Sequence, residues 1–121
     1  MQKDLADFSI SCAASLLDAA EAIAKNHSRC VMVVDGTKVV GVVSEGDLVR
    51  ALLSGTEIHA PLASFIHHAF KFLQSKDLGK ALNLMRTHGI TLIPILDDGF
   101  SLIDVITLPD LLSQVALRID D

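Results

Sequence analysis

The sequence predicts an α+β fold made of two copies of one helix–strand–strand–helix unit, and an internal repeat is the main reason. Residues 35–47, with the sequence DGTKVVGVVSEGD, return as residues 98–110, with the sequence DGFSLIDVITLPD. Each copy contains a turn, an apolar strand, and Ser or Thr followed three residues later by Asp. In a chain of 121 residues, neither copy is expected to bury its apolar face alone. Residues 1–60 and 61–121 are therefore expected to pack together as one compact domain.

An amphipathic helix is expected at the start of each unit. Residues 15–27 and residues 77–88 both carry apolar side chains three and four positions apart, which is the spacing of one buried helix face. Each segment also begins with a residue that can accept a hydrogen bond from the first helical turn, Ser15 in the first copy and Asp77 in the second.

A β-hairpin is expected after each of these helices. Asp35-Gly36 and Asp98-Gly99 are signals for tight turns between strands. The flanking segments are short apolar runs rich in β-branched residues, typical of strands buried on both faces. Pro94 cannot donate to a strand ladder, so its position is expected at a sheet edge or a bulge. The four expected strands cover residues 31–34, 39–43, 91–96 and 101–106.

A second helix is expected after each hairpin, over residues 45–53 and residues 108–116. A short extended segment is expected to lead into each unit, at residues 8–10 and residues 70–72. Residues 56–70 connect the two copies and have room for one helical turn near Leu62 and Phe65.

The composition argues against nucleic-acid binding and against membrane insertion. The formal net charge is −5, the Lys and Arg residues are scattered, and the aromatic residues are five Phe without Trp or Tyr. Nucleic-acid binding needs clustered basic residues, and single strands usually also need aromatic stacking platforms. No apolar run approaches the ~20 residues of a membrane helix. Residues 1–7 carry two acids and do not resemble a secretion signal.

The cysteine content bears on the cellular compartment of the protein, and the apolar content bears on its assembly. Cys12 and Cys30 do not form a disulfide framework, so a reducing, cytoplasmic compartment is expected. Hydrophobic residues make up 50% of the chain, which is high for a protein with so much surface relative to its volume. Part of that apolar surface is expected to lie against a second subunit, as in a homodimer, or against another domain.

The residues with chemical potential lie where a strand ends and a helix begins. Ser44 and Asp47 occupy this place in the first copy, and Thr107 and Asp110 in the second. One interpretation is a capping box, which satisfies the free amides of a helix start. The other is a ligand site, because helix N-termini bind anions and a carboxylate can accept both hydroxyls of a ribose. Arg50, one turn after Asp47, would add a phosphate partner, and nearby apolar residues would hold a base.

The segment from Gly41 to Leu48, after an Asp-Gly hairpin and a short helix, resembles the cystathionine-β-synthase (CBS) domain. The tandem repeat resembles a CBS pair, also called a Bateman module, over roughly residues 8–115. The family pattern of Gly, two apolar residues, Ser or Thr, two variable residues and Asp is complete in the first copy. The second copy has Asp104 where the family usually has Gly.

This resemblance implies two β-α-β-β-α repeats with small three-stranded sheets flanked by helices, packed about a pseudo-twofold axis. It also implies flat dimers and inter-repeat clefts that often bind an adenine nucleotide or related ligand, such as AMP, ADP, ATP or S-adenosylmethionine, and no other cofactor. Asp47 and Asp110 would hold ribose, and Ser44 and Thr107 would touch phosphate or ribose. The residues that the resemblance places along the base slots are Ile10, Phe72, Val31 and Met32.

The two candidate sites are not expected to be equal. Arg50 favours a phosphate near Asp47, whereas Asp104 adds a second negative charge near Asp110 and repels it. Pro109 also removes one amide donor from the second helix start. The Asp47 site is therefore expected to bind a nucleotide better.

No metal site and no catalytic group is expected. A zinc site needs three or four ligands at fitting spacing, and the adjacent His67 and His68 point to different faces in regular structure. Cys30 begins a buried strand, where a thiol is usually inert. Ser44 lacks the Gly-x-Ser-x-Gly context of a nucleophile elbow.

The sequence therefore predicts a regulatory ligand-binding module that controls an attached or partner catalytic domain, for example a nucleotidyltransferase. The alternative is a ligand-free structural dimerisation module of a larger protein, which the apolar excess favours. A free-standing enzyme is the weakest hypothesis, because no acid–base pair or nucleophile has a poised partner.

Overall fold

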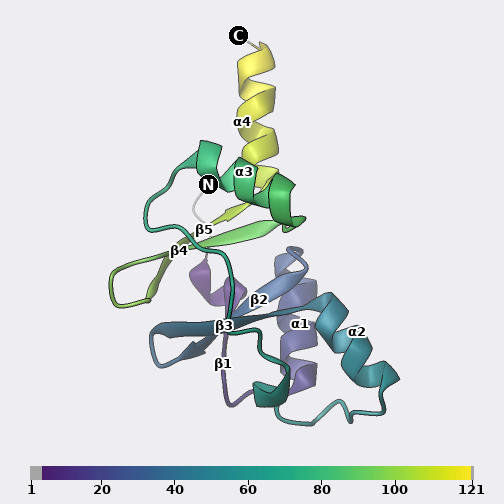
Figure 1. The fold of residues 1–121 in the computed structure, drawn as a ribbon. Helices are drawn as coiled ribbons and strands as arrows, with labels where there is room; N and C mark the ends of the chain where they lie inside the picture. Colours follow the sequence, from purple (N-terminus) through teal and green to yellow (C-terminus); the bar gives the residue numbers. More distant parts are fainter. Residues whose placement is uncertain (1–3, 121) are drawn as a thin grey trace.

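The computed structural model describes residues 4–120 and shows two lobes, each a small β-sheet with helices beside it (Figure 1). The first copy runs through η1 (Leu5–Phe8), β1 (Ser9–Ser11), α1 (Leu16–Asn26), β2 (Cys30–Asp35), β3 (Lys38–Ser44) and α2 (Glu45–Leu53). The linker holds η2 (Leu62–Phe65), and the second copy consists of α3 (Leu78–His88), β4 (Leu92–Leu96), β5 (Leu102–Thr107) and α4 (Leu108–Asp120). Residues 1–3 and 121, at the outer ends of the two expected units, lie outside the described residues.

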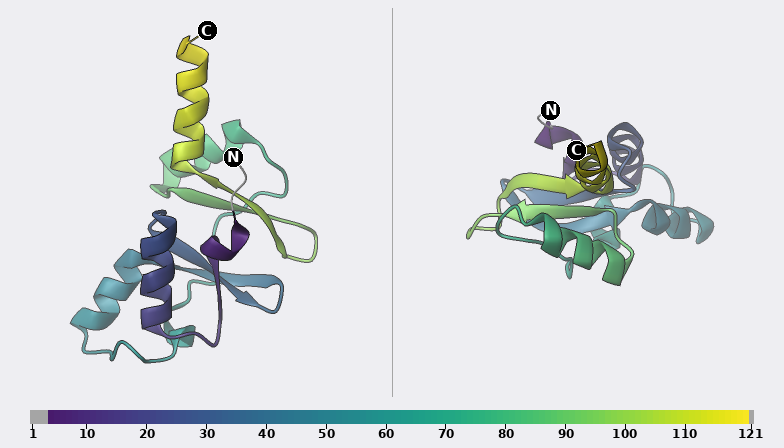
Figure 2. Two further views of the ribbon diagram at one scale, coloured as in Figure 1. Left: turned by 180° about the vertical axis from the view of Figure 1, so that it is seen from behind. Right: turned by 90° about the horizontal axis from the view of Figure 1, so that it is seen from above.

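The α+β fold and the predicted helices and hairpins are confirmed, and most element ends lie within one or two residues of the expected positions. The exception is α4, which continues to Asp120 and extends away from the two sheets (Figure 2). The predicted caps are also present. Ser15 Oγ accepts from Asp18 N at 3.2 Å, and Asp77 Oδ1 accepts from Lys80 N at 3.0 Å.

The two sheets differ, although the resemblance implies three strands in each. In the first copy β2 is central, parallel to β1 and antiparallel to β3. In the second copy β4 and β5 form a two-stranded antiparallel sheet. The strand expected over residues 70–72 is not formed, and Leu73 makes only an isolated parallel bridge with Ile95.

Pro94 gives a physical reason for the missing third strand. Pro94 has the place in β4 that Met32 has in β2, where Met32 pairs with Ser9 of β1. Proline has no N–H to donate to a neighbouring strand. Two bonds remain, from Leu73 N to Pro94 O at 3.0 Å and from Leu96 N to Leu73 O at 2.9 Å. The prediction that Pro94 lies at a sheet edge is therefore confirmed.

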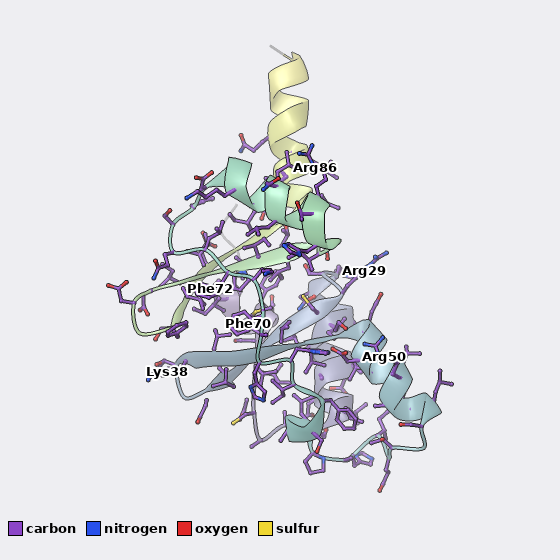
Figure 3. All side chains as sticks on the ribbon, in the orientation of Figure 1. Arg29, Lys38, Arg50, Phe70, Phe72 and Arg86 are labelled. Carbon is purple, nitrogen blue, oxygen red and sulfur yellow. The ribbon has the colours of Figure 1, made fainter. Side chains whose placement is uncertain are left out.

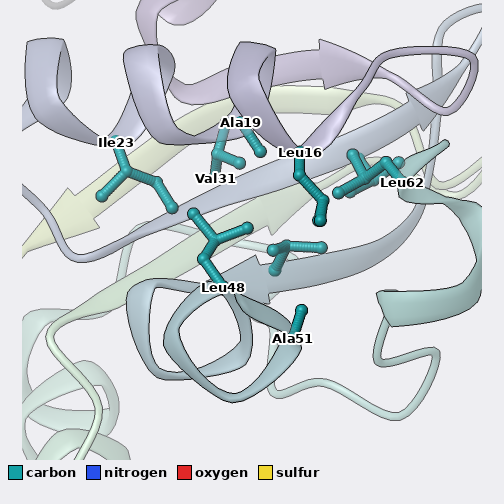
Figure 4. Packing of buried hydrophobic residues seen from close by; sticks show 9 residues of the cluster. Leu16, Ala19, Ile23, Val31, Leu48, Ala51 and Leu62 are labelled. Atoms are coloured by element: carbon teal, nitrogen blue, oxygen red, sulfur yellow. The ribbon is translucent and has the colours of Figure 1, made fainter. Parts of the chain in front are cut away.

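Each copy has its own apolar core. The core of the first copy lies between α1, α2 and the first sheet, and Figure 4 shows α1 and α2 contributing side chains from opposite sides. Its buried members are Leu16, Ala19, Ile23, Val31, Val33, Val43, Leu48, Ala51 and Leu62. The buried members of the second core are Ala81, Met85, Ile93, Ile95, Ile106 and Leu111.

A third cluster joins the two copies. It contains Phe8, Met32, Val39, Leu92, Leu96 and Val105, contributed by both sheets and by η1. Hydrogen bonds accompany it across the same contact, among them one from Ser101 Oγ to Thr37 Oγ1 at 3.2 Å. Val39 N donates to Phe100 O at 2.8 Å, and Thr91 Oγ1 donates to Ser28 O at 3.0 Å. Apolar contacts and hydrogen bonds therefore connect the two copies.

The linker lies against the first copy and crosses β3 (Figure 1). Leu62 has no exposed surface, belongs to the first core, and donates its N–H to Ala14 O at 2.9 Å. His67 pairs with Val42 of β3 through two backbone hydrogen bonds of 2.9 and 3.0 Å. This path brings the His67 side chain to the start of α2. Among residues 4–120, no helix is both long and apolar enough to span a membrane.

Leu96→Ala is expected to lower the free energy of unfolding by about 2–5 kcal/mol, because the truncation leaves a cavity between the two copies. Leu96 is fully buried, whereas Leu53 is 83% exposed and serves as the matched control. Leu53→Ala is expected to stay within about 0.5 kcal/mol of the unchanged protein. Urea denaturation measures both values. Equal losses in the two variants would show that the contact between the copies does not support the fold.

Candidate functional site

The junction of β3 and α2 is a reciprocal capping box, as one interpretation of the sequence expects. Ser44 N donates to Asp47 Oδ2 at 2.8 Å, and Asp47 N donates to Ser44 Oγ at 3.2 Å. The Ser44 hydroxyl also donates to Asp47 Oδ2 at 3.0 Å. Since these bonds fix Asp47 at the first turn of α2, they also fix the carboxylate that the ligand interpretation uses.

Two cationic or potentially cationic groups contact the other oxygen of this carboxylate. Arg50 Nη2 lies 2.6 Å from Asp47 Oδ1, and His67 Nε2 lies 2.7 Å from the same atom. The side chain of Asp47 is only 6% exposed, while those of Arg50 and His67 are 71% and 60% exposed. A nearly buried carboxylate is thus paired at the protein surface, which offsets the cost of removing it from water.

These contacts set the ionisation of Asp47. Burial on its own raises the pKa of this carboxyl, but the hydrogen bonds from Ser44 N, His67, the Ser44 hydroxyl and Arg50 together outweigh burial. The pKa of Asp47 therefore lies below its ordinary value. The carboxylate is charged at neutral pH and can act only as a hydrogen-bond acceptor.

Three of the cavities formed by the described residues border this junction. The largest, about 440 Å³, lies between α2 and the linker and is lined by Asp47, Arg50, Ala51, Ser54, Ser64, Phe65, Ile66 and His67. The second, about 230 Å³, lies between the copies and is lined by Cys30, Met32, Val42, Ser44, His67, Ala69, Phe70, Lys71, Ile90, Leu92 and Pro94. The third, about 250 Å³, is lined by Ser28, Arg29, Cys30, Ser44, Glu45, Gly89, Ile90 and Thr91.

The structure brings together some of the residues expected to bind a ligand. Met32 and Ser44 line the cavity between the copies, and Asp47 and Arg50 line the cavity beside α2. Figure 3 shows Arg50 on α2 and Arg29 nearer the contact between the lobes. Ser44 and Asp47 therefore face neighbouring cavities, although their backbones belong to one capping box.

Other residues expected along the base slots lie elsewhere. Val31 has no exposed surface and belongs to the first core. Ile10 packs against the same core from β1. The Phe72 ring contacts two other rings, with centroids 5.9 Å from Phe70 and 5.6 Å from Phe100. Figure 3 places Phe70 and Phe72 between the lobes, and Phe70 is the ring that lines the inter-copy cavity.

The second junction has the same capping geometry with different surroundings. Thr107 N donates to Asp110 Oδ2 at 2.8 Å, and Asp110 N donates to Thr107 Oγ1 at 3.4 Å. Thr107 is buried and Asp110 is partly buried. Neither residue lines the three cavities around the first junction. Asp104 Oδ1 accepts from Val105 N at 2.8 Å, which turns this carboxylate toward its own strand.

The contact between His67 and Asp47 is a feature of this site that the sequence does not predict. The spacing of 20 residues between the two matches no helical or strand period, so no local pattern connects them. In the sequence, the adjacent His67 and His68 suggest only a metal site. The described residues contain no group of three or more His, Cys, Asp or Glu that could hold a metal ion. Burial raises the pKa of the Cys30 thiol to about 12, so this cavity residue is a poor nucleophile at neutral pH.

A family model of the CBS domain matches the chain twice, at residues 1–54 and residues 67–117. Among curated proteins, the chain is 32% identical over 90 residues to an uncharacterized protein of Helicobacter pylori strain J99. It is 36% identical over 93 residues to an uncharacterized protein of Rickettsia prowazekii. These matches cover 73% and 74% of this chain, but the chain spans only 27% and 28% of the two longer relatives.

Solved structures show the same fold. The chain is similar to a CBS domain protein of Pyrobaculum aerophilum complexed with AMP, with a TM-score of 0.77, 23% identity, and coverage of 93% of this chain and 88% of that chain. It is also similar to a CBS domain pair/ACT domain protein of Thermotoga maritima, with a TM-score of 0.74 and 17% identity. That match covers 92% of this chain and 89% of that chain. A third similar structure contains the CBS domains of a transcriptional regulator of Streptococcus pneumoniae, with a TM-score of 0.76 and 16% identity. That match covers 93% of each chain.

Asp47→Asn is expected to flatten the loss of stability in acid. The pKa of Asp47 is lower in the folded chain than in the unfolded chain, so the unfolded chain binds the proton first as pH falls. The stabilisation is fully present above the unfolded pKa of about 3.9 and is lost as pH falls through the folded pKa. Urea denaturation from about pH 6 down to about pH 2 measures this. Parallel profiles for the two proteins would contradict the charge pairing around Asp47.

Proposed function

Because this chain belongs to the CBS domain family, we propose that it is a regulatory module that binds an adenine nucleotide or a related nucleoside between its two copies. The observation that carries this proposal is the placement of Ser44 and Asp47 at a helix start that borders cavities beside and between the copies. A helix N-terminus with a hydroxyl suits a phosphate, and a carboxylate suits ribose hydroxyls.

The cavity between the copies has the chemistry of a base and phosphate site. Met32, Val42 and Leu92 give it apolar walls from both copies. Lys71 lines the same cavity, and Arg29 lines the adjoining one, where it lies 3.7 Å from Glu45. This arrangement supports binding of a flat, weakly polar base together with an anionic group. AMP in the Pyrobaculum aerophilum protein is in line with such a ligand.

A ligand in this position would act on the relation between the copies. The cavity is lined by β2 and β3 of the first copy, by the linker, and by β4 of the second. A molecule that contacts all of them favours one arrangement of the two lobes, and this preference is the free energy available for regulation. The proposed recipient is an attached or partner catalytic domain, such as a nucleotidyltransferase. A cytoplasmic location fits the free thiols of Cys12 and Cys30.

Calorimetric titration with AMP, ADP, ATP and S-adenosylmethionine tests the binding. Asp47→Ala is expected to lower the affinity at least about tenfold, since a lost charged hydrogen bond is worth about 1.5–3 kcal/mol. Asp110→Ala, the matching change in the second copy, is expected to have the smaller effect. Loss of the cap itself costs about 1 kcal/mol of stability, so thermal melts must show that both variants remain folded. If millimolar ligand gives neither heat of binding nor a shift in melting temperature, the proposed function is wrong.

A second candidate function, assembly without a ligand, is favoured by apolar side chains on the outer helices. A groove of about 180 Å³ between α3 and α4 is lined by Leu78, Gly79, Leu82, Leu108, Leu111, Leu112 and Gln114. Leu82 and Leu112 are 47% and 59% exposed. Two exposed leucines beside one groove are the kind of surface that association covers. A second copy of this chain is the proposed partner, which gives a homodimer.

Light scattering is expected to report twice the mass of one chain. Leu112→Glu is expected to shift this mass to that of a monomer, because the new charge would be buried without a partner. Ile103→Glu is the control, since Ile103 is 50% exposed on β5 and lies outside the groove. A dimer that survives Leu112→Glu would place the interface on another surface.

A further inference from the structure

The linker is tied to β3 at a point where β3 has no side chain. A Cβ at Gly41 would overlap the side chain of Ile66 and would lie 2.7 Å from the carbonyl oxygen of His67. The linker therefore lies directly on the strand. Two backbone hydrogen bonds between Val42 and His67 hold it there, and His68 Nδ1 donates to Val40 O at 2.9 Å.

This path takes the His67 side chain to Asp47. Because a carboxylate oxygen only accepts, the 2.7 Å contact means that His67 Nε2 carries a proton and donates it to Asp47 Oδ1. Arg50 donates to the same oxygen. Ser44 N and Ser44 Oγ donate to Oδ2. A carboxylate has about four acceptor positions, and these four donors occupy them.

A ribose hydroxyl that binds Asp47 must therefore displace one of these donors. The two Ser44 donors belong to the cap of α2, and Ser44 N is fixed by the backbone. The Arg50 and His67 side chains are 71% and 60% exposed and can turn away into solvent. Only His67 lines both the cavity beside α2 and the cavity between the copies. Its departure would free an acceptor and also open a passage between the Ser44 cavity and the Asp47 cavity.

We propose that His67 is an internal competitor for the ribose-binding carboxylate, so that a nucleotide binds only when the His67–Asp47 hydrogen bond breaks. This inference rests on the proposed function. The observed affinity is then the intrinsic affinity multiplied by the fraction of molecules in which His67 has left Asp47. Anything that shifts the linker, whose residues join the two copies, shifts that fraction and hence the affinity.

Calorimetric titration of three proteins with AMP and ATP tests this inference. His67→Ala is expected to bind about 5- to 30-fold more tightly than the unchanged chain, because no competitor remains and the cavities are joined. His88→Ala is the matched control. It changes an exposed histidine at the end of α3 that lines neither cavity, and it is expected to bind as the unchanged chain does.

The outcomes separate this inference from the proposed function. Equal affinity of the His67→Ala and unchanged proteins, with measurable binding in both, would overturn the competition and leave the nucleotide site in place. Failure of both proteins to bind would overturn the proposed function and this inference with it. In the unchanged chain, NMR of the histidine side chains gives a second readout. The His67 ring signals are expected to move on saturation with AMP, and an unchanged His67 environment in the bound protein would contradict the displacement.

Discussion

The contact between the two sheets is the constraint on which the rest of the molecule depends. Each copy has a small core, and the faces that carry Met32 and Leu92 pack together in the cluster that joins the copies. Because these faces are apolar, the two lobes must dock to remove them from water. The same docking closes the cavity beside Ser44, whose walls come from β2, β3 and β4. The cavity of the proposed ligand site is thus a consequence of how the fold is stabilised.

Asp47 caps α2 and is also the carboxylate of the proposed ligand site. It completes the cap of α2 through Ser44 and holds the linker through His67, while its pKa stays low because of these contacts. A group with this many internal partners stabilises the unliganded form, so any ligand must replace contacts of comparable strength. The arrangement differs from an open, preformed site, in which the carboxylate would have no internal donors to exchange. Because His67 belongs to the linker, the hydrogen bonding of Asp47 depends on where the linker lies.

The parts of the fold that local rules govern could be predicted from the sequence. Apolar spacing, Asp-Gly turns and the caps at Ser15 and Asp77 each depend on a few neighbouring residues, and the helices and hairpins follow from them. For residues 70–72 two signals conflict. The repeat predicts a third strand in the second copy, whereas Pro94 lacks the N–H that would bind such a strand, and the strand is not formed. The His67 contact depends on how the linker crosses β3, which no spacing reveals. Val31 lies in the core because its strand is covered on that face too.

The absence of a side chain at position 41 has a consequence for the internal symmetry of the pair. The linker rests on β3 at Gly41, whereas the matching position of β5 carries Asp104, whose carboxylate contacts its own backbone. The two copies of the repeated unit therefore differ at these matching positions, because the linker covers β3 at Gly41 and a carboxylate stands at Asp104 of β5. A ligand bound beside Gly41 would therefore meet surroundings that the second copy does not repeat, and its effect on the two copies would be unequal.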